Sequence, residues 1–145
     1  MAKTSDSVDV DLSVEDTWAA ATDLMRFNEW LVLHDGWRSA VPAPHELFEG
    51  MALTSIVNVK GTRIRFDWQI EKYRVHEEIA LKGKGKGGVK AKLDLAIVPT
   101  AAGSTVTFTV DVGGLPLIGP AGKAVAMAVH GDLRESLTTF RRVFG

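Results

Sequence analysis

Alternation of polar and apolar side chains predicts several β-strands along this chain. The pattern is clearest at 63–71, where one face carries only apolar side chains, namely Ile64, Phe66, Trp68 and Ile70. The same period predicts strands at 7–12, 51–59, 78–82, 89–97 and 105–112, and a short edge strand at 45–48. Short turns such as Lys60-Gly61 join consecutive strands, so we expect an antiparallel meander.

Helical spacing follows the first strand and returns at the end of the chain. Ser13 is a predicted N-cap, because an acid follows it three residues later and complements the helix dipole. The inward face of this helix would carry Trp18, Ala21, Thr22 and Met25. A second short helix is predicted at 27–33, followed by a loop, and a long amphipathic helix begins near Pro120. The apolar stripe of this last helix is predicted to carry Ala121, Ala124, Val125, Ala128, Val129, Leu133, Leu137 and Phe140. Together these elements predict an α+β fold in which a curved antiparallel sheet wraps around the C-terminal helix.

The two predicted faces differ in the size of their side chains. The sheet supplies Phe66, Trp68 and Phe108. The helix supplies small residues, namely Ala121, Ala124, Ala128 and Gly131. Small side chains either let the helix approach closely over a filled core or leave a void, and both interpretations stay open. The second predicts an apolar pocket of roughly 300–1,000 Å³.

Composition limits the classes of function. The chain has 145 residues, of which 46% are hydrophobic and 24% charged, and its formal net charge is −1. We expect one globular domain spanning 1–145. There is no cysteine, which excludes disulfides and thiol nucleophiles. The near-neutral charge argues against a dedicated nucleic-acid binder. Residues 1–11 do not resemble a signal peptide, and the apolar stretch 113–129 is interrupted by prolines, glycines and a lysine and cannot span a membrane. We therefore expect a soluble cytoplasmic protein. We also expect no cofactor.

Two segments near the N-terminus carry a family resemblance. The stretch 14–18 is similar to a "P-x-E-x-[VA]-[WF]" start, although Ser13-Val14 stands where a proline often occurs. The stretch 24–30, preceded by Asp23, is similar to a "D-x-x-x-[FY]-x-x-W" segment. With the order of elements, these segments resemble the START-like superfamily, also called SRPBCC. That resemblance implies a helix-grip fold, with two short helices after the first strand.

Two glycine-rich stretches narrow the resemblance. Residues 87–93 and 113–120 look like an actinobacterial branch labelled polyketide cyclase/dehydrase-like, some members of which are labelled toxins of toxin–antitoxin pairs. The superfamily implies a pocket for a small hydrophobic, lipid- or polyketide-like ligand between sheet and terminal helix. Its activities range from lipid transfer to polyketide cyclisation, so the fold leaves three functions open. These are ligand binding or transport, a cyclase/aromatase enzyme, and a toxin or regulatory component with an antitoxin-like protein partner.

A histidine and two tryptophans cluster where the superfamily usually has its pocket entrance. Trp30, His34 and Trp37 could stack a flat ligand and bind its oxygen, or the two tryptophans could simply anchor the core. Asp35 could orient His34 as a general base, although neighbours on an extended segment point apart. His130 would offer a polar group to a ligand if it faced inward, but the helical period places it beside the apolar line.

The expected ligand contacts combine rings, thioethers and these histidines. The predicted ligand-binding residues are Trp30, His34, Trp37, Met51, Phe66, Trp68, Phe108, Met127 and His130. An enzyme would need a proton-transfer group beside a bound carbonyl, and the candidates are His34, Asp35, Tyr73 and His130. The four histidines show no metal-ligand spacing, so no metal site is predicted.

Lysines recur at even spacing in one predicted hairpin. They are Lys82, Lys84, Lys86, Lys90 and Lys92. Such a basic ribbon could contact RNA, an acidic lipid surface or an acidic partner. The alternative is an edge hairpin that its lysines keep soluble. No aromatic residue interleaves the lysines, which weakens an interpretation as a single-strand nucleic-acid site.

Overall fold

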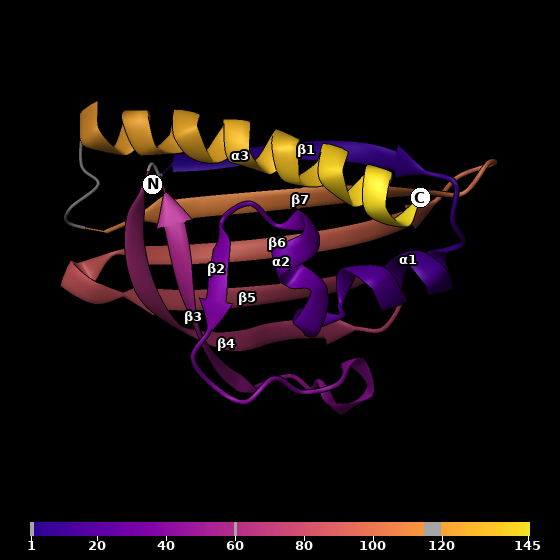
Figure 1. The fold of residues 1–145 in the computed structure, drawn as a ribbon, viewed down its shortest axis with the longest axis horizontal. Coiled ribbons are helices and arrows are strands. Elements are labelled where there is room, and N and C mark those ends of the chain that lie inside the picture. Colours follow the sequence, from indigo (N-terminus) through magenta and orange to yellow (C-terminus); the bar gives the residue numbers. More distant parts are fainter. Residues whose placement is uncertain (1, 60, 115–119) are drawn as a thin grey trace.

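A single antiparallel sheet forms the body of the protein (Figure 1). The computed structural model describes residues 2–59, 61–114 and 120–145. Within them the sheet has the strand order β1-β7-β6-β5-β4-β3-β2. The strands are β1 (Ala2–Val10), β2 (His34–Trp37), β3 (Ala52–Val59), β4 (Thr62–Arg74), β5 (Glu78–Gly85), β6 (Lys90–Pro99) and β7 (Ser104–Gly113).

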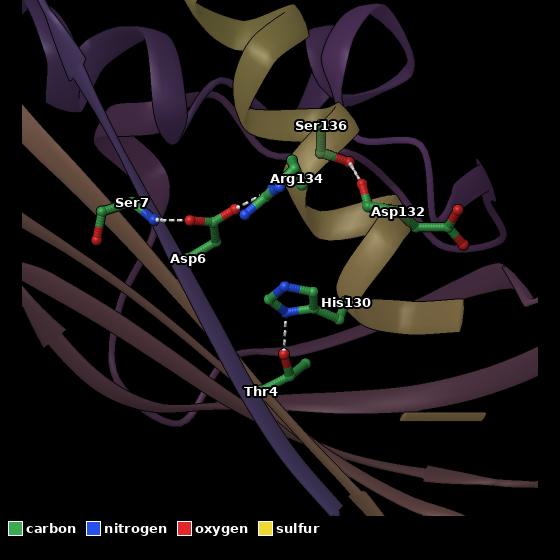
Figure 2. Close-up of polar contacts among 7 residues, drawn as sticks. All are labelled: Thr4, Asp6, Ser7, His130, Asp132, Arg134 and Ser136. Carbon is green, nitrogen blue, oxygen red and sulfur yellow. Dashed lines mark hydrogen bonds and ion pairs between the residues drawn. The ribbon is translucent and has the colours of Figure 1, made fainter. Parts of the chain in front are cut away.

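Helices cover the concave face of this sheet. They are α1 (Val14–Ala21), α2 (Phe27–Trp30) and α3 (Pro120–Phe144), with single 3-10 turns at Leu24–Arg26, Pro44–Glu46 and Lys86–Gly88. The long α3 runs beside β1, and Figure 2 shows His130 and Arg134 turned toward that strand. The His130 ring bonds the Thr4 hydroxyl, and Arg134 pairs with Asp6 at 3.3 Å. This arrangement confirms the predicted α+β helix-grip fold.

The start of α1 follows the predicted capping pattern. The Ser13 hydroxyl accepts the Asp16 N–H at 3.1 Å, which satisfies an otherwise free donor of the first turn. Trp18, Ala21 and Thr22 are buried as expected. Met25 is 71% exposed, so its predicted place in the core is wrong. The helix ends at Ala21, and the following 3-10 turn buries Leu24 in its place.

Two local predictions between α2 and β3 are wrong. The expected edge strand at 45–48 is instead the 3-10 turn Pro44–Glu46, where the Glu46 carboxylate accepts the Ala43 N–H at 2.8 Å. Residues 34–37 form β2 rather than a loop, and they pair irregularly with β3. Gly36 has a φ of +122°, which only glycine adopts readily and which accommodates this irregularity.

The lysine-bearing hairpin lies in the middle of the sheet. It is formed by β5 and β6, whose outer neighbours are β4 and β7, whereas β1 and β2 form the sheet edges. The interpretation of these lysines as protectors of an edge is therefore wrong. In the turn between β3 and β4, Gly61 has a φ of +81°, while Lys60 of the predicted turn lies outside the described residues.

The face of α3 that meets the sheet agrees with the predicted apolar stripe only at its large side chains. Val129, Leu133, Leu137 and Phe140 are buried as expected. Ala124 and Gly131 are instead exposed, Ala128 is half-buried, and the side chain of Ala121 lies outside the described part. Burying the large side chains removes more apolar surface from water than burying alanines, so they decide how the helix is rotated. Space inside the fold therefore does not come from a row of alanines.

Candidate ligand-binding site

An apolar cavity of about 340 Å³ lies between the concave face of the sheet, the α1–α2 segment and α3. Side chains from β2 to β7 line it, and α3 adds Val125 and Val129. Its volume falls within the range of small-molecule sites. An apolar cavity of about 150 Å³ already stays dry and binds benzene or xenon, so this larger one can hold an organic molecule.

Two stacked rings form one wall of the cavity. The ring centroids of Phe66 and Trp68 lie 5.0 Å apart, and the angle between the two ring planes is 22°. Trp68 Nε1–H donates to Ser55 Oγ at 2.9 Å, which fixes the orientation of the indole. The two rings therefore form one stacked apolar pair in the wall, which we call the ring platform.

Two glycines on β5 make the ring platform sterically feasible. Gly83 pairs with Trp68 and Gly85 with Phe66 across the β4–β5 ladder. A Cβ at Gly83 would lie 2.6 Å from Trp68 Cζ3, closer than unbonded carbons approach, and one at Gly85 would lie 3.0 Å from the Phe66 ring. Because Gly83 and Gly85 have no side chains, both rings can lie close against this part of β5. Sequence reasoning missed this role, although glycines on the inward face of a strand indicate a close neighbour.

His34 brings an ionisable group to the cavity wall. Its partly buried ring lies 4.8 Å from the Trp37 ring and 5.8 Å from the Phe27 ring, measured between centroids. Burial disfavours the charged imidazolium and lowers the pKa of His34 to about 4, and the nearby Asp35 carboxylate opposes this only in part. His34 is therefore neutral at pH 7. Asp35 instead pairs with Arg63 at 2.6 Å.

Other polar groups of the cavity wall are few and mostly occupied. The Thr22 hydroxyl donates to the Trp18 carbonyl at 2.7 Å. The Ser55 hydroxyl accepts the Trp68 N–H and so keeps its own proton to donate. Thr62 lies at the exposed end of the lining. Among the described lining residues, His34 is the one with an ionisable side chain. The site can therefore offer hydrogen bonds to a ligand oxygen but no formal charge at neutral pH.

Five of the nine predicted ligand-binding residues line this cavity, namely His34, Trp37, Phe66, Trp68 and Phe108. Trp30 does not line it, because its ring packs edge-on against Phe108 and Phe140 and is 2% exposed. Met51 is partly buried and packs against the core outside the lining. Their ligand contacts stay a prediction.

The two remaining residues, on α3, lie away from the cavity. Met127 is 78% exposed, and His130 contacts Thr4 of β1 (Figure 2). The positions of Met127 and His130 follow from the rotation of α3, because this rotation buries Val129 and Leu133. Val125 and Val129 line the cavity, and although the helical spacing placed them on the apolar stripe, they were not among the predicted ligand-binding residues.

Of the proposed proton-transfer groups, His34 alone lines the cavity. Tyr73 packs against Trp18 at 5.8 Å between ring centroids and directs its hydroxyl to the Pro44 carbonyl at 3.5 Å.

No helix in the described part of the chain combines the length and apolar character needed to cross a bilayer.

Comparison with known proteins places this geometry in a family. The family described as "Polyketide cyclase / dehydrase and lipid transport" matches residues 1–145. The chain is 46% identical over 144 residues to "Toxin Rv0910" of Mycobacterium tuberculosis, covering 99% of both chains. It is also 39% identical over 145 residues to the uncharacterized protein Rv1546 of the same species, covering all of both chains.

Solved structures share the fold at lower sequence identity. A START superfamily protein from Mycobacterium smegmatis has a TM-score of 0.77 and 19% identity, covering 99% of this chain and 97% of that one. Protein CV1439 from Chromobacterium violaceum has a TM-score of 0.70 and 14% identity, covering 99% and 98%. The helix-grip fold, the cavity beneath α3 and the full-length match agree, and the chain belongs to the polyketide cyclase/dehydrase and lipid transport family.

Proposed function

We propose that this protein binds and carries one small, neutral, hydrophobic molecule in the cavity beneath α3. The observation that carries the proposal is the cavity itself, about 340 Å³ in volume and walled almost entirely by apolar side chains. The family description, which names lipid transport and polyketide chemistry, supports a ligand of lipid- or polyketide-like character.

The chemistry of the wall favours a neutral ligand with one or two oxygens. A carboxylate would enter a low-dielectric site without a cation to pair with, which is costly. A hydroxyl or carbonyl oxygen instead finds hydrogen-bonding groups at His34 and Ser55. The ring platform of Phe66 and Trp68 offers a flat face against which an unsaturated or ring-containing ligand can stack.

The same geometry supports binding over acid–base catalysis. A general base works best when its pKa lies near the working pH. His34 has a pKa of about 4 and is a weak base at neutral pH. Asp35 pairs with Arg63 outside the cavity lining, and its charge raises the pKa of His34 too little to offset the effect of burial. The cyclase interpretation therefore has one weak candidate group in the cavity.

Thermal unfolding with a panel of apolar compounds tests the proposal. The panel contains long-chain alcohols, fatty acids and polycyclic aromatic ketones. A ligand at about 100 times its Kd adds about 2.7 kcal/mol of stability, which raises Tm by several degrees. We expect neutral compounds to raise Tm more than carboxylates of the same length. Absence of a shift across the whole panel would contradict the proposal.

Two glycines, one beside the cavity and one on the surface, give matched variants for this experiment. Gly83→Ala forces the Trp68 ring away from β5 and into the cavity, so we expect it to reduce the ligand-induced shift strongly. Gly131→Ala adds the same methyl group in open space on the exposed face of α3, and we expect the full shift. If Gly83→Ala does not fold, Gly85→Ala makes a milder intrusion by the Phe66 ring. An undiminished shift in a folded Gly83→Ala or Gly85→Ala protein counts against the site.

A second candidate function comes from the named relatives. Two curated Mycobacterium tuberculosis proteins that are 46% identical over almost the whole chain carry the name toxin. This name supports a role as a toxin or regulatory component with an antitoxin-like partner. Growth during induced expression tests it, and arrest that a neighbouring gene product relieves is the supporting result. Unimpaired growth would remove this candidate and leave ligand binding unaffected.

A further inference from the structure

The outer, convex face of the sheet carries a basic surface that the cavity does not explain. It consists of five exposed lysines of the β5–β6 hairpin and Arg65 of β4, which we call the basic face: Arg65, Lys82, Lys84, Lys86, Lys90 and Lys92. None of these six side chains forms an ion pair within the described part of the chain. The acids beside them are fewer than the cations: Asp67 lies opposite Lys84 and Asp111 opposite Lys92, and Glu71 and Asp94 line a surface pocket together with Lys92.

The placement of these lysines costs stability within the sheet. Lys82 lies directly opposite Lys92, and Lys84 directly opposite Lys90, across the β5–β6 ladder. Like charges at directly opposed positions destabilise a strand pair. Protection of a sheet edge does not account for them either, because β5 and β6 are central strands. Like charges held together at the centre of a sheet indicate an anionic partner that offsets their repulsion.

The chemistry of the surface distinguishes between anionic partners. The aromatic side chains of β4, namely Phe66, Trp68 and Tyr73, pack on the concave side, so the basic face offers no ring on which a base could stack. The outward positions of β5 and β6 within the basic face likewise carry no large apolar side chain of the kind that anchors a protein interface, since the exposed Val98 lies at the other end of β6. Flexible lysines without an apolar anchor suit the diffuse negative charge of an anionic bilayer surface.

The position of the basic face relative to the cavity supports the same partner. Ala91 and Leu93 of β6 line the cavity, while Lys90 and Lys92, which alternate with them, point outward. Figure 1 shows the β5–β6 turn, the adjoining ends of β3 and β4, and the start of α3 at one end of the molecule. Half-buried lining residues gather at that end, and include Val59, Ile64 and Val125.

From these observations we propose that the basic face docks the protein on anionic lipid bilayers, with the open end of the cavity close to the membrane surface. The charge pattern carries the docking itself. The further consequence, that docking brings the cavity to a source of apolar ligand, rests on the proposed function.

Sedimentation with lipid vesicles tests this proposal. The probes are vesicles of phosphatidylcholine alone and of phosphatidylcholine with phosphatidylglycerol. We expect the protein to bind the anionic vesicles only, and binding to weaken with added salt. Lys84→Glu with Lys90→Glu should weaken vesicle binding by at least about tenfold. The control is Arg141→Glu with Arg142→Glu, which changes the net charge by the same amount near the C-terminal end of α3. Its vesicle binding should be nearly unchanged.

The outcomes separate docking from cargo binding. Absence of binding to anionic vesicles, or equal loss in both double variants, overturns the proposal. Binding to single-stranded RNA or to an acidic polypeptide without affinity for vesicles also overturns it. The ligand-induced Tm shift, measured without vesicles, should persist in the Lys84→Glu, Lys90→Glu protein. A protein that docks but shows no such shift in any form retains the docking proposal and loses the proposed function.

Discussion

His34 links the apolar character of the cavity to the stability of the protein. An imidazole held among the rings of Phe27 and Trp37 loses hydration, and its neutral form is favoured. In the unfolded chain the same ring is charged below about pH 6.5. A measurement of stability against pH therefore reports how dry this part of the cavity wall is.

Because of this histidine, the free energy of unfolding should decrease as the pH is lowered. The pKa of His34 is about 4 in the folded protein, so between pH 6.5 and 4 the unfolded chain binds a proton that the folded one does not. The contribution of neutral His34 to the free energy of unfolding is thus fully present above pH 6.5. It decreases as the pH falls toward 4 and then stays constant. We expect His34→Gln to remove about 1–2 kcal/mol of this decline, allowing for partial solvent contact.

Urea unfolding of both proteins between pH 4 and 7 measures this effect. Burial and the neighbouring Glu78 carboxyl raise the pKa of Asp94 to about 6, so Asp94 titrates in the same range. The difference between wild type and His34→Gln cancels that contribution. Parallel stability curves for the two proteins would contradict the burial of His34.

Single residues differ in how far the sequence could place them. Phe66, Trp68 and Phe108 were predictable because the strand period of two assigns each side chain to one face. Met127 was not, because several neighbouring helix stripes contain apolar or small residues, and the rotation of α3 is decided by packing against the sheet. For His130 the helical period already indicated a position beside the apolar line, where the structure has it. The close fit of Gly83 against Trp68 depends on the strand register, which the sequence does not state.

At the scale of elements, α3 closes the cavity and completes the core. Its residues Val129, Leu133, Leu137 and Phe140 are all buried. The Ser136 hydroxyl accepts the Val32 N–H at 2.8 Å and ties the segment after α2 to the helix. The helix therefore holds both the sheet and the α2 segment in place.

Two truncations on α3 test this orientation. Leu133 is fully buried, and Leu133→Ala should lower the free energy of unfolding by about 2–5 kcal/mol. Met127 is 78% exposed, and Met127→Ala should change it by no more than about 0.5 kcal/mol and leave the ligand-induced Tm shift intact. Urea denaturation measures both variants. Similar losses in the two proteins would mean that α3 is rotated differently.

The strong periodic elements were predictable, and the short ones were not. Strands β3, β4, β6 and β7 carry enough alternation to identify them, and Ser13 marks the start of α1. The four-residue β2 contains Gly36 and depends on pairing with β3, so no local pattern indicates it. At 45–48 the Pro44 ring and the Glu46 carboxylate favour a tight turn over the extended backbone that the apolar spacing suggested.

For the whole molecule, the overall fold followed from the order of elements, whereas the origin of the open space did not. The expected source was a row of alanines on the helix. The structure instead has glycines on β5 that let two rings lie close to that strand, and Val125 and Val129 of α3 in the same lining. A cavity depends on where side chains end in three dimensions, and this requires the register of the sheet and the rotation of the helix together.

The existence of an accessible, dry cavity is the claim on which binding depends. Xenon enters apolar cavities that hold no water, so diffraction from crystals of this protein pressurised with xenon tests the claim directly. We predict xenon density between the ring platform and Val129, with the surrounding side chains unmoved. Side chains filling that volume, with no xenon bound there, would contradict the account.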